Sequence, residues 1–214
     1  MKKSYIIGAV ILLVVIGGYV VYEHEYGPKA KYQKGLHYYK DGNYKKAATL
    51  FKEAAKQGYA PAEEKLGYMY GRGRGVPQDH YEAVHWFKKA AKQGNAAAEY
   101  WLGLMYLGGL GVSQHYTKAV HWFKKAAEQG NAKGEDALGG MYRYGKGVPR
   151  DYNKAFYWVK KAAEQGYARA EYNLGHMYAK GLGVRQDYSK ALHWYKKAAK
   201  KGFKRARRKL RHLE

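Results

Sequence analysis

A 36-residue period runs through most of this chain and limits the folds that it can adopt more than any other feature. The motif Leu-Gly-x-Met-Tyr occurs four times at this spacing, beginning at Leu66, Leu102, Leu138 and Leu174. Each copy is followed by a Gly-x-Gly-Val turn and then by Trp-x-Lys-Lys-Ala-Ala. Units that repeat at such a period bury their apolar faces against their neighbours, so the period predicts an extended stack of similar units.

Within one copy, the hydrophobic spacing predicts two helices. Tyr59–Tyr70 has apolar residues at helical spacing and Gly67 at its centre, where glycine costs about 1 kcal/mol relative to alanine. Because every copy has glycine there, we expect it to allow a close approach of the second helix. That helix has an apolar stripe over Ala83–Ala91, and we expect Asp79 to cap it, with Glu82 completing a capping box.

These motifs give the chain a family resemblance that covers about four fifths of its length. Gly134 and His115 are the departures from the pattern, in place of an Ala and an Asp. The pattern resembles the Sel1-like repeat, a relative of the tetratricopeptide repeat. That resemblance implies an all-α solenoid, a right-handed superhelix of antiparallel helix pairs with a concave binding face. The residues that carry it in one copy are Ala62, Leu66-Gly67, Tyr70, Gly73-x-Gly75-Val76, Asp79, Ala83, Trp86, Ala90-Ala91 and Gly94.

The period also predicts how the chain is divided. Residues 1–22 form a candidate membrane helix and 23–30 a linker, and 31–58 is a shorter unit that resembles a tetratricopeptide repeat without the Gly-rich turn. Four Sel1-like repeats follow at 59–94, 95–130, 131–166 and 167–202. Residues 203–214 have no second helix after them, so we expect a basic capping helix with a polar outer face.

The first segment has the features of a signal anchor. Lys2 and Lys3 precede Tyr5–Tyr22, a run of eighteen residues without a charge. As a helix it would reach roughly 27 Å, at about 1.5 Å per residue, which is enough to cross a bilayer core. Ile16–Gly18 is a poor cleavage site, so an uncleaved anchor is favoured over secretion after signal cleavage. The two lysines favour a cytoplasmic N-terminus, which predicts a single-pass protein of the inner (cytoplasmic) membrane with its repeats facing the periplasm or exterior.

The sequence has few residues that could catalyse a reaction. There is no Cys, and Ser occurs only at positions 4, 113 and 189, with no S-x-x-K or G-x-S-x-G motif. None of the Gly-rich segments matches a phosphate-binding loop, and no H-E-x-x-H zinc motif is present. We therefore predict that the protein is not an enzyme and needs no metal or cofactor.

Repetition within one chain separates structural from functional residues, because a binding site is needed only once. Glu63, Glu99, Glu135 and Glu171 occupy equivalent positions early in the first helices. Taken singly, each could be a catalytic carboxylate. As four equivalent residues, they are expected to favour the helix N-termini and pair with lysines.

The first-helix positions that the repeat motif leaves free are the candidate binding face. By resemblance to tetratricopeptide repeats, such positions line the concave groove, and here they include Glu64 and Asp136. An aromatic groove with interspersed charge suits a peptide or glycan partner, although the same tyrosines could instead fill gaps between repeats. The candidate groove residues are Tyr39, Tyr68, Arg72, Tyr100, Leu104, Leu107, Arg143, Tyr144, Tyr172, His176 and Lys180.

Positive charge is the other candidate binding feature. The net charge is +23, from 40 Lys and Arg against 17 Asp and Glu, which suits an anionic partner or reflects a basic proteome. Paired lysines on the second helices, such as Lys88-Lys89, predict a repeating basic stripe or a solvated outer face. The last helix adds a candidate anionic-surface site of Lys204, Arg205, Arg207, Arg208 and Lys209.

Taken together, these features predict a non-catalytic, membrane-anchored scaffold. Its concave groove would bind a protein or peptide, or a wall component such as peptidoglycan, and its basic surface could meet anionic lipid. Bacterial envelope proteins with similar repeats suggest a regulatory or host-interaction role. The alternative is a cytoplasm-facing binder of nucleic acid or another anionic polymer, which only the charge supports.

Overall fold

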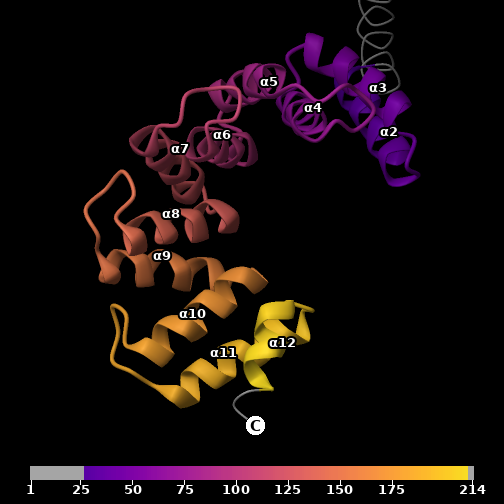
Figure 1. Ribbon diagram of the computed structural model, residues 1–214. Helices are drawn as coiled ribbons and strands as arrows, with labels where there is room; N and C mark the ends of the chain where they lie inside the picture. The colour runs from indigo at the N-terminus through magenta and orange to yellow at the C-terminus, as the bar shows by residue number, and fades with distance from the viewer. Residues whose placement is uncertain (1–26, 212–214) are drawn as a thin grey trace, which may run out of the picture. The chain divides into compact units, whose positions relative to one another are not determined.

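The computed structural model of the protein describes residues 27–211 and divides the chain into two compact units, Met1–Gln93 and Gly94–Glu214 (Figure 1). Within residues 27–211 all regular structure is α-helical, and no strand is present. The N-terminal unit contains α2 (Pro28–Lys40), α3 (Tyr44–Lys56), α4 (Ala60–Arg72) and α5 (His80–Lys92). The C-terminal unit contains α6 (Ala96–Gly108), α7 (Tyr116–Glu128), α8 (Ala132–Tyr144), α9 (Tyr152–Glu164), α10 (Ala168–Lys180), α11 (Tyr188–Lys200) and α12 (Lys204–Leu210).

Within each unit, consecutive helices pack side by side in chain order (Figure 1). Even-numbered helices are the first helices of the repeats, and odd-numbered helices are the second ones. The described part of the chain is therefore an all-α repeat solenoid of paired helices, as the sequence predicts.

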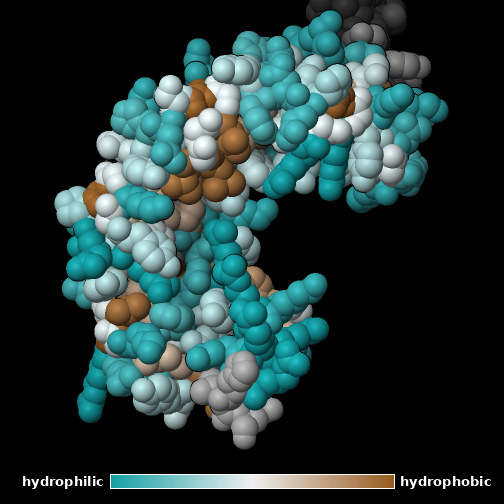
Figure 2. All heavy atoms as spheres, viewed as in Figure 1, coloured by the Kyte–Doolittle hydropathy of each residue, from teal (hydrophilic) through white to brown (hydrophobic). Residues whose placement is uncertain are grey.

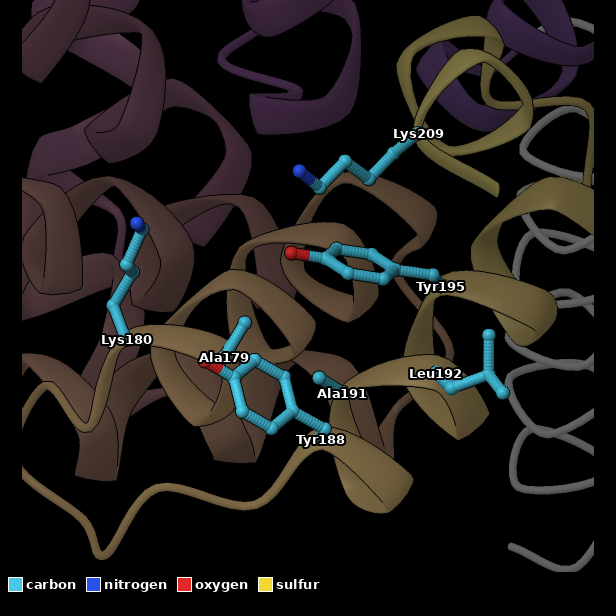
Figure 3. Close-up of a pocket in the computed structure, with 7 residues that line it drawn as sticks. All are labelled: Ala179, Lys180, Tyr188, Ala191, Leu192, Tyr195 and Lys209. Atoms are coloured by element: carbon cyan, nitrogen blue, oxygen red, sulfur yellow. The ribbon is translucent and has the colours of Figure 1, made fainter. Parts of the chain in front are cut away.

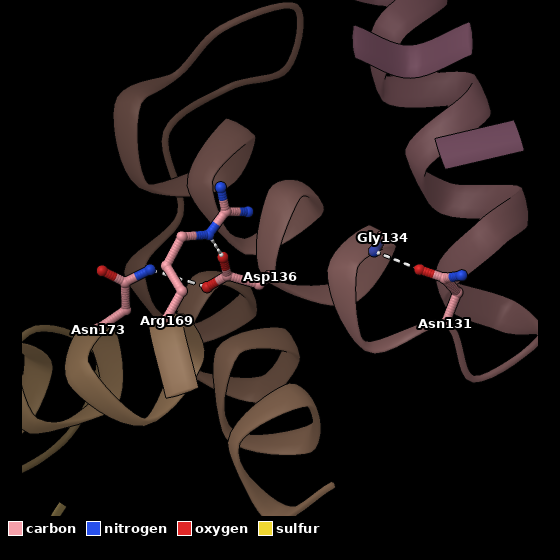
Figure 4. Close-up of polar contacts among 5 residues, drawn as sticks. All are labelled: Asn131, Gly134, Asp136, Arg169 and Asn173. Atoms are coloured by element: carbon pink, nitrogen blue, oxygen red, sulfur yellow. Dashed lines mark hydrogen bonds and ion pairs between the residues drawn. The ribbon is translucent and has the colours of Figure 1, made fainter. Parts of the chain in front are cut away.

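Short polar side chains and glycines set where the helices begin and end. The side chain of Asn131 caps α8 by accepting a 2.9 Å hydrogen bond from the Gly134 N–H (Figure 4). The same helix ends at Gly145, whose φ of 64° lies in the left-handed region that favours glycine. The N–H of the next residue, Lys146, donates back to the Met141 carbonyl at 3.1 Å. Left-handed glycines end the first helices of the other repeats in the same way, but the N-cap residues of α4 and α10 are Tyr59 and Tyr167, which make no side-chain capping bond.

The capping box expected at α5 does not form. Asp79 accepts from the Glu82 N–H at 3.0 Å, as a cap should. Its own N–H, however, donates to the Tyr70 carbonyl at 3.0 Å, and the Glu82 carboxylate accepts from the Trp86 indole at 3.1 Å. The turn between the two helices already satisfies the donor that Glu82 would have reached.

The glycine at the centre of each first helix lies where the paired helices approach most closely. A Cβ atom at Gly139 would lie 2.6 Å from Val159 Cγ2 and 3.1 Å from the Ala155 carbonyl oxygen on α9. Any side chain there would push α8 and α9 apart, because one of these contacts is with backbone. This confirms the close approach expected from the sequence.

We call the contact zone between the paired helices the seam, and it contains a buried glutamate in each of the four repeats. In α8, Glu135 has no exposed surface. One of its oxygens accepts a 2.7 Å hydrogen bond from Gln165, and the other lies 3.5 Å from Lys161 Nζ. Lys161 also lies over the Trp158 ring, 5.1 Å from its centroid. The expected pairing of these glutamates with lysines is confirmed.

Burial raises the pKa of Glu135, against the opposing effects of Lys161 and Gln165. The pKa values of Glu63 and Glu99 are raised for the same reason, each opposed by a lysine and a glutamine. In the last repeat the glutamine position is taken by Lys201, whose ammonium group bonds Glu171 at 2.6 Å.

These contacts divide the predicted basic stripe. Lys88, Lys124 and Lys160 are exposed, but the lysine that follows each of them is half-buried in the seam. In these three repeats the second lysine of the pair therefore contributes to the seam, whereas both lysines of the last pair, Lys196 and Lys197, are exposed.

The predicted membrane anchor, Tyr5–Tyr22, lies outside the described residues. Among the helices within residues 27–211, none is both long and apolar enough to cross a membrane.

Candidate functional site: a groove on the first helices

A hollow in the C-terminal unit lies across the first helices α6, α8 and α10 and reaches the capping helix α12. We call it the central groove, and it encloses about 300 Å³. Of the groove residues expected from the sequence, it brings together Leu104, Leu107, Tyr144 and Tyr172. Its lining also includes Phe123, Asp136, Ala137, Gly140, Met141, Lys146, Arg169, Asn173, Phe203 and Arg205.

The surface near the groove changes character along the unit. In Figure 2, apolar side chains gather over α6, and the surface over α12 is mostly hydrophilic. The sequence accounts for both, because α6 has Glu99 as its one charged residue, whereas α12 is Lys-Arg-Ala-Arg-Arg-Lys-Leu. The central groove therefore runs from an apolar end to a cationic end.

A polar network lies in the wall of the central groove (Figure 4). Asp136, only 3% exposed, accepts from Arg169 Nε at 2.5 Å and from Asn173 Nδ2 at 2.8 Å. Asp136 is therefore committed to internal bonds and is not a free groove position as the sequence pattern suggested. Its partners come one repeat later, at i+33 and i+37, which is why the pattern within a single copy does not reveal them.

Tyr100, another candidate groove residue, is mostly buried and packs against other side chains of the protein. Its side chain is 7% exposed, and its ring packs against Trp101 and Phe123 with centroid separations of 5.4 and 6.0 Å. Burial raises the pKa of Tyr100, with Arg169 opposing that shift. In the structure this tyrosine fills space between helices and supports the groove wall.

The candidate groove residues of the N-terminal unit form a separate cluster. At its centre is an arginine that the sequence pattern did not single out. The guanidinium of Arg74 lies over the rings of Tyr39, Tyr44 and Tyr68, at 5.8, 5.5 and 5.8 Å from their centroids. It also donates a hydrogen bond to the Tyr39 hydroxyl, which is the main cause of the raised pKa of Arg74. The exposed Arg72 lies over the Tyr68 ring at 5.9 Å. These cation–π contacts hold the tyrosines as a group.

Arg143, His176 and Lys180 come together near the end of the C-terminal unit. Of these three residues, Lys180 lines a second pocket (Figure 3). Arg143 Nη2 lies 3.3 Å from His176 Nδ1. Burial lowers the pKa of His176, and the positive charges of Arg143, Lys180 and Lys209 lower it further. The second pocket has a volume of about 350 Å³ and is lined by Ala179, Lys180, Tyr188, Ala191, Leu192, Tyr195 and Lys209.

The candidate anionic-surface residues on α12 are all exposed, but they face different neighbours. Arg205 lines the central groove and Lys209 lines the second pocket. Arg207 Nε donates to the Ala199 carbonyl at 3.2 Å and so fastens α12 to α11. Lys204 and Arg208 are exposed to solvent.

The fold and its repeated seam define a class of protein, the helical-pair solenoid. The Sel1 repeat family model matches residues 16–40, 24–59, 60–95, 96–131, 132–167 and 168–203. The chain belongs to the Sel1 repeat family. Proteins of this family generally mediate protein–protein interactions, and the repeat scaffold is generally non-catalytic.

Solved structures agree with this assignment. A Sel1 repeat protein from Oxalobacter formigenes is 36% identical, with a TM-score of 0.77 over 84% of this chain and 73% of that one. A Sel1 repeat protein from Klebsiella pneumoniae subsp. pneumoniae is 24% identical, with a TM-score of 0.61 over 87% of this chain and 93% of that one. Immunity protein Pa5087 from Pseudomonas aeruginosa, also 24% identical, has a TM-score of 0.60 over 81% and 68% of the two chains. The latter two likenesses show the fold alone. The sequence matches none of the curated proteins.

Proposed function

We propose that the protein is a non-catalytic scaffold whose central groove binds an extended segment of a protein partner. The observation that carries this proposal is the division of each repeat into a constant seam and a variable first-helix face. The position of Leu104 is Tyr68, Gly140 and His176 in the other repeats, whereas the buried glutamate is present in all four. A surface that varies while the fold around it stays constant is suited to recognition.

The chemistry of the central groove fits a peptide. Leu104, Leu107 and Phe203 provide apolar surface, while Lys146 and Arg205 place cations at the same hollow. Peptides bind well to surfaces that combine aromatic anchors with a few polar groups, because burial supplies affinity and the polar groups supply register. A groove of this composition would accept alternating apolar and acidic side chains.

The test is a pair of tyrosines with similar exposure. Tyr144 lines the central groove and is 65% exposed, whereas Tyr157 on α9 lies outside it and is 55% exposed. Twelve-residue peptides would be selected from a random display library on the full chain, and their affinities measured by fluorescence anisotropy. We expect Tyr144→Ala to weaken binding by about tenfold, which is typical of a central aromatic anchor, and Tyr157→Ala to leave it unchanged.

Two results would count against the groove. One is a selection that yields no peptide above background. The other is a set of peptides that lose affinity with Tyr157→Ala as much as with Tyr144→Ala. Because both side chains are exposed, neither substitution should disturb the fold, and circular dichroism of the two variants checks this.

We also propose that Tyr5–Tyr22 anchors the protein in the cytoplasmic membrane with its repeats outside. The uninterrupted apolar run after Lys2 and Lys3 supports this proposal. The test is protease digestion of a C-terminal tag in intact cells, spheroplasts and lysed membranes. Digestion that requires only an opened outer envelope supports the anchor and its orientation. Protection until lysis would place the repeats in the cytoplasm, and recovery of the chain in the soluble fraction would remove the anchor.

A further inference from the structure

The end of the C-terminal unit holds a group of cations without acidic partners. Arg143 comes from α8, Lys180 from α10 and Lys209 from α12, and the charges of all three act on His176. Within residues 27–211, none of the three forms an ion pair with a carboxylate, although many other lysines do. We call Arg143, His176, Lys180, Tyr195 and Lys209 the terminal cation site. Because like charges repel at short range, this arrangement favours a bound anion.

Tyr195 gives the terminal cation site a hydrogen-bond donor. Its side chain is 1% exposed, and its hydroxyl is buried without a hydrogen-bond partner. In the three preceding repeats the same position is Phe87, Phe123 and Val159, which have no hydroxyl to satisfy. The fold therefore does not need this polar atom, and a buried hydroxyl without a partner is destabilising.

Figure 3 shows how the donor and the cations are arranged. The side chains of Tyr195 and Lys209 extend in the same direction, toward the side of the second pocket where Lys180 rises from the end of α10. Burial raises the pKa of Tyr195 to about 12, so the hydroxyl keeps its proton and acts as a donor at neutral pH. The rest of the lining includes Ala179, Ala191 and Leu192, which are apolar.

We propose that the terminal cation site binds an acidic side chain of the partner segment that occupies the central groove. One carboxylate oxygen accepts the hydrogen bond of the Tyr195 hydroxyl, and the ammonium groups of Lys180 and Lys209 neutralise the charge. The methylene groups of that side chain contact the apolar lining of the second pocket. This inference rests on the proposed peptide-binding function and adds the chemistry of the partner to it.

The geometry favours a carboxylate on a peptide over the phosphates of a nucleic acid. A nucleic-acid backbone is bound by cations spread along its length, with aromatic rings exposed for base stacking. Here Lys180 and Lys209 line one small pocket together with the buried Tyr195, and Tyr188 is the one exposed ring in that lining, so there is no row of rings along which successive bases could stack. A single acidic side chain fits this arrangement.

The experiment is a double-mutant cycle between the protein and a selected peptide. Peptides from the display selection would be compared with versions in which each Glu or Asp is replaced by Gln or Asn, on the wild type and on Lys209→Gln and Tyr195→Phe. We expect the acidic peptide to lose about tenfold in affinity with Tyr195→Phe, the size expected for a hydrogen bond to a charged group. We expect a loss of about fivefold with Lys209→Gln. The neutral peptide should distinguish the variants much less, because its amide oxygen can still accept a hydrogen bond but carries no charge.

Controls separate this site from general charge effects. Lys196→Gln removes an exposed charge from α11, and Tyr157→Phe removes an exposed hydroxyl from α9, so neither should change affinity. Acidic and neutral peptides that respond alike to Tyr195→Phe and Lys209→Gln would overturn the inference. If Tyr144→Ala still weakens the binding of those peptides, the proposed function of the central groove stands, and only the inference about the terminal cation site is lost. Displacement of the acidic peptide by a twelve-nucleotide oligothymidylate, in a Lys209-dependent way, would also overturn it and favour a phosphate polymer.

Discussion

The seam and the first-helix face of the C-terminal unit lie on the same helices. The seam keeps nearly the same residues from repeat to repeat, whereas the residues of the face change. At the seam, Glu99 and Glu135 have the same two partners, a glutamine and a lysine, and in both repeats that lysine lies over a tryptophan ring. On the face, the residue at the position of Glu64 is Tyr100, then Asp136, then Tyr172. The first of these is packed, the second is bonded to the next repeat, and the third lines the central groove.

This difference shows which contacts the fold requires. A seam contact recurs because every pair of helices must meet in the same way, and a change in one copy breaks that copy. A face contact is made once, so each copy can use its position for packing, for a network or for binding. Substitutions at the seam should therefore alter stability, and substitutions on the face should alter recognition.

The largest effect is expected at the glycine of the seam. Gly139→Leu would place a side chain against Val159 and the backbone of Ala155. Overpacking of a tight core typically costs 1–3 kcal/mol, and contact with backbone places this substitution at the upper end, about 3 kcal/mol. Urea unfolding followed by circular dichroism measures the change.

The adjacent residue is the matched control. A Cβ atom at Gly140 meets nothing within 4 Å, because this residue faces the central groove and not α9. Gly140→Leu should be neutral or stabilising by up to about 1 kcal/mol, since leucine is the better helix former. Equal losses at 139 and 140 would show that the close approach of the helices is not the reason for the glycine.

The second-largest loss of stability is expected when a buried glutamate of the seam is removed. Glu135→Ala would leave Gln165 without its acceptor and Lys161 without its ion pair. Because Lys161 remains 40% exposed and can be hydrated, we expect a cost of about 2 kcal/mol, below that of a fully buried pair. Glu164→Ala, at a 56% exposed side chain on α9, should cost less than about 0.5 kcal/mol. A loss of stability from Glu135→Ala that is as small as the loss from Glu164→Ala would contradict a structural role for Glu135.

Much of the fold could be predicted from the sequence because its signals are local and repeated. The 36-residue period, the glycine at position 139 and the Asp or Asn before a helix each act within one repeat and its pair. The capping box at Glu82 was predicted wrongly because the Tyr70 carbonyl, on the preceding helix, takes the donor first. The basic stripe was only half correct because Trp158 and Glu135 draw Lys161 into the seam.

The candidate site was harder to predict because it depends on contacts between repeats. The sequence placed Leu104, Leu107, Tyr144 and Tyr172 on one face, and the structure brings them to one groove. It could not show that Asp136 is held by Arg169, because their side chains meet only after two repeats have stacked. Tyr195 was missed for another reason. Phenylalanine occupies the equivalent position in two other repeats, so the sequence indicates a core residue. Only the structure shows that the hydroxyl of Tyr195 has no partner.

Tyr195 lies at the seam, but its position holds different residues in the other repeats. It therefore sharpens the comparison between the seam and the first-helix face. Tyr195→Phe restores the residue found at two equivalent seam positions and removes the unpaired hydroxyl. We expect it to stabilise the protein by about 1 kcal/mol, the lower end of the cost of such a group. Tyr157→Phe, at an exposed tyrosine, should change nothing. A destabilised Tyr195→Phe protein in urea unfolding would mean that the hydroxyl serves the fold and not a ligand.

The smallest effect concerns pH and follows from the raised pKa values of Glu99 and Glu135, which burial causes. A carboxyl group with a higher pKa in the folded state binds its proton more tightly there than in the unfolded chain. Its contribution to stability is thus fully present below the ordinary glutamate range and is lost as the pH rises through the raised value. The free energy of unfolding of the wild type, relative to Glu99→Gln/Glu135→Gln, should therefore increase as the pH falls from 7 to 4. Urea unfolding at several pH values measures this difference. A relative stability that falls with acidification would mean that the lysines outweigh burial, and the seam would then be an ordinary ion pair.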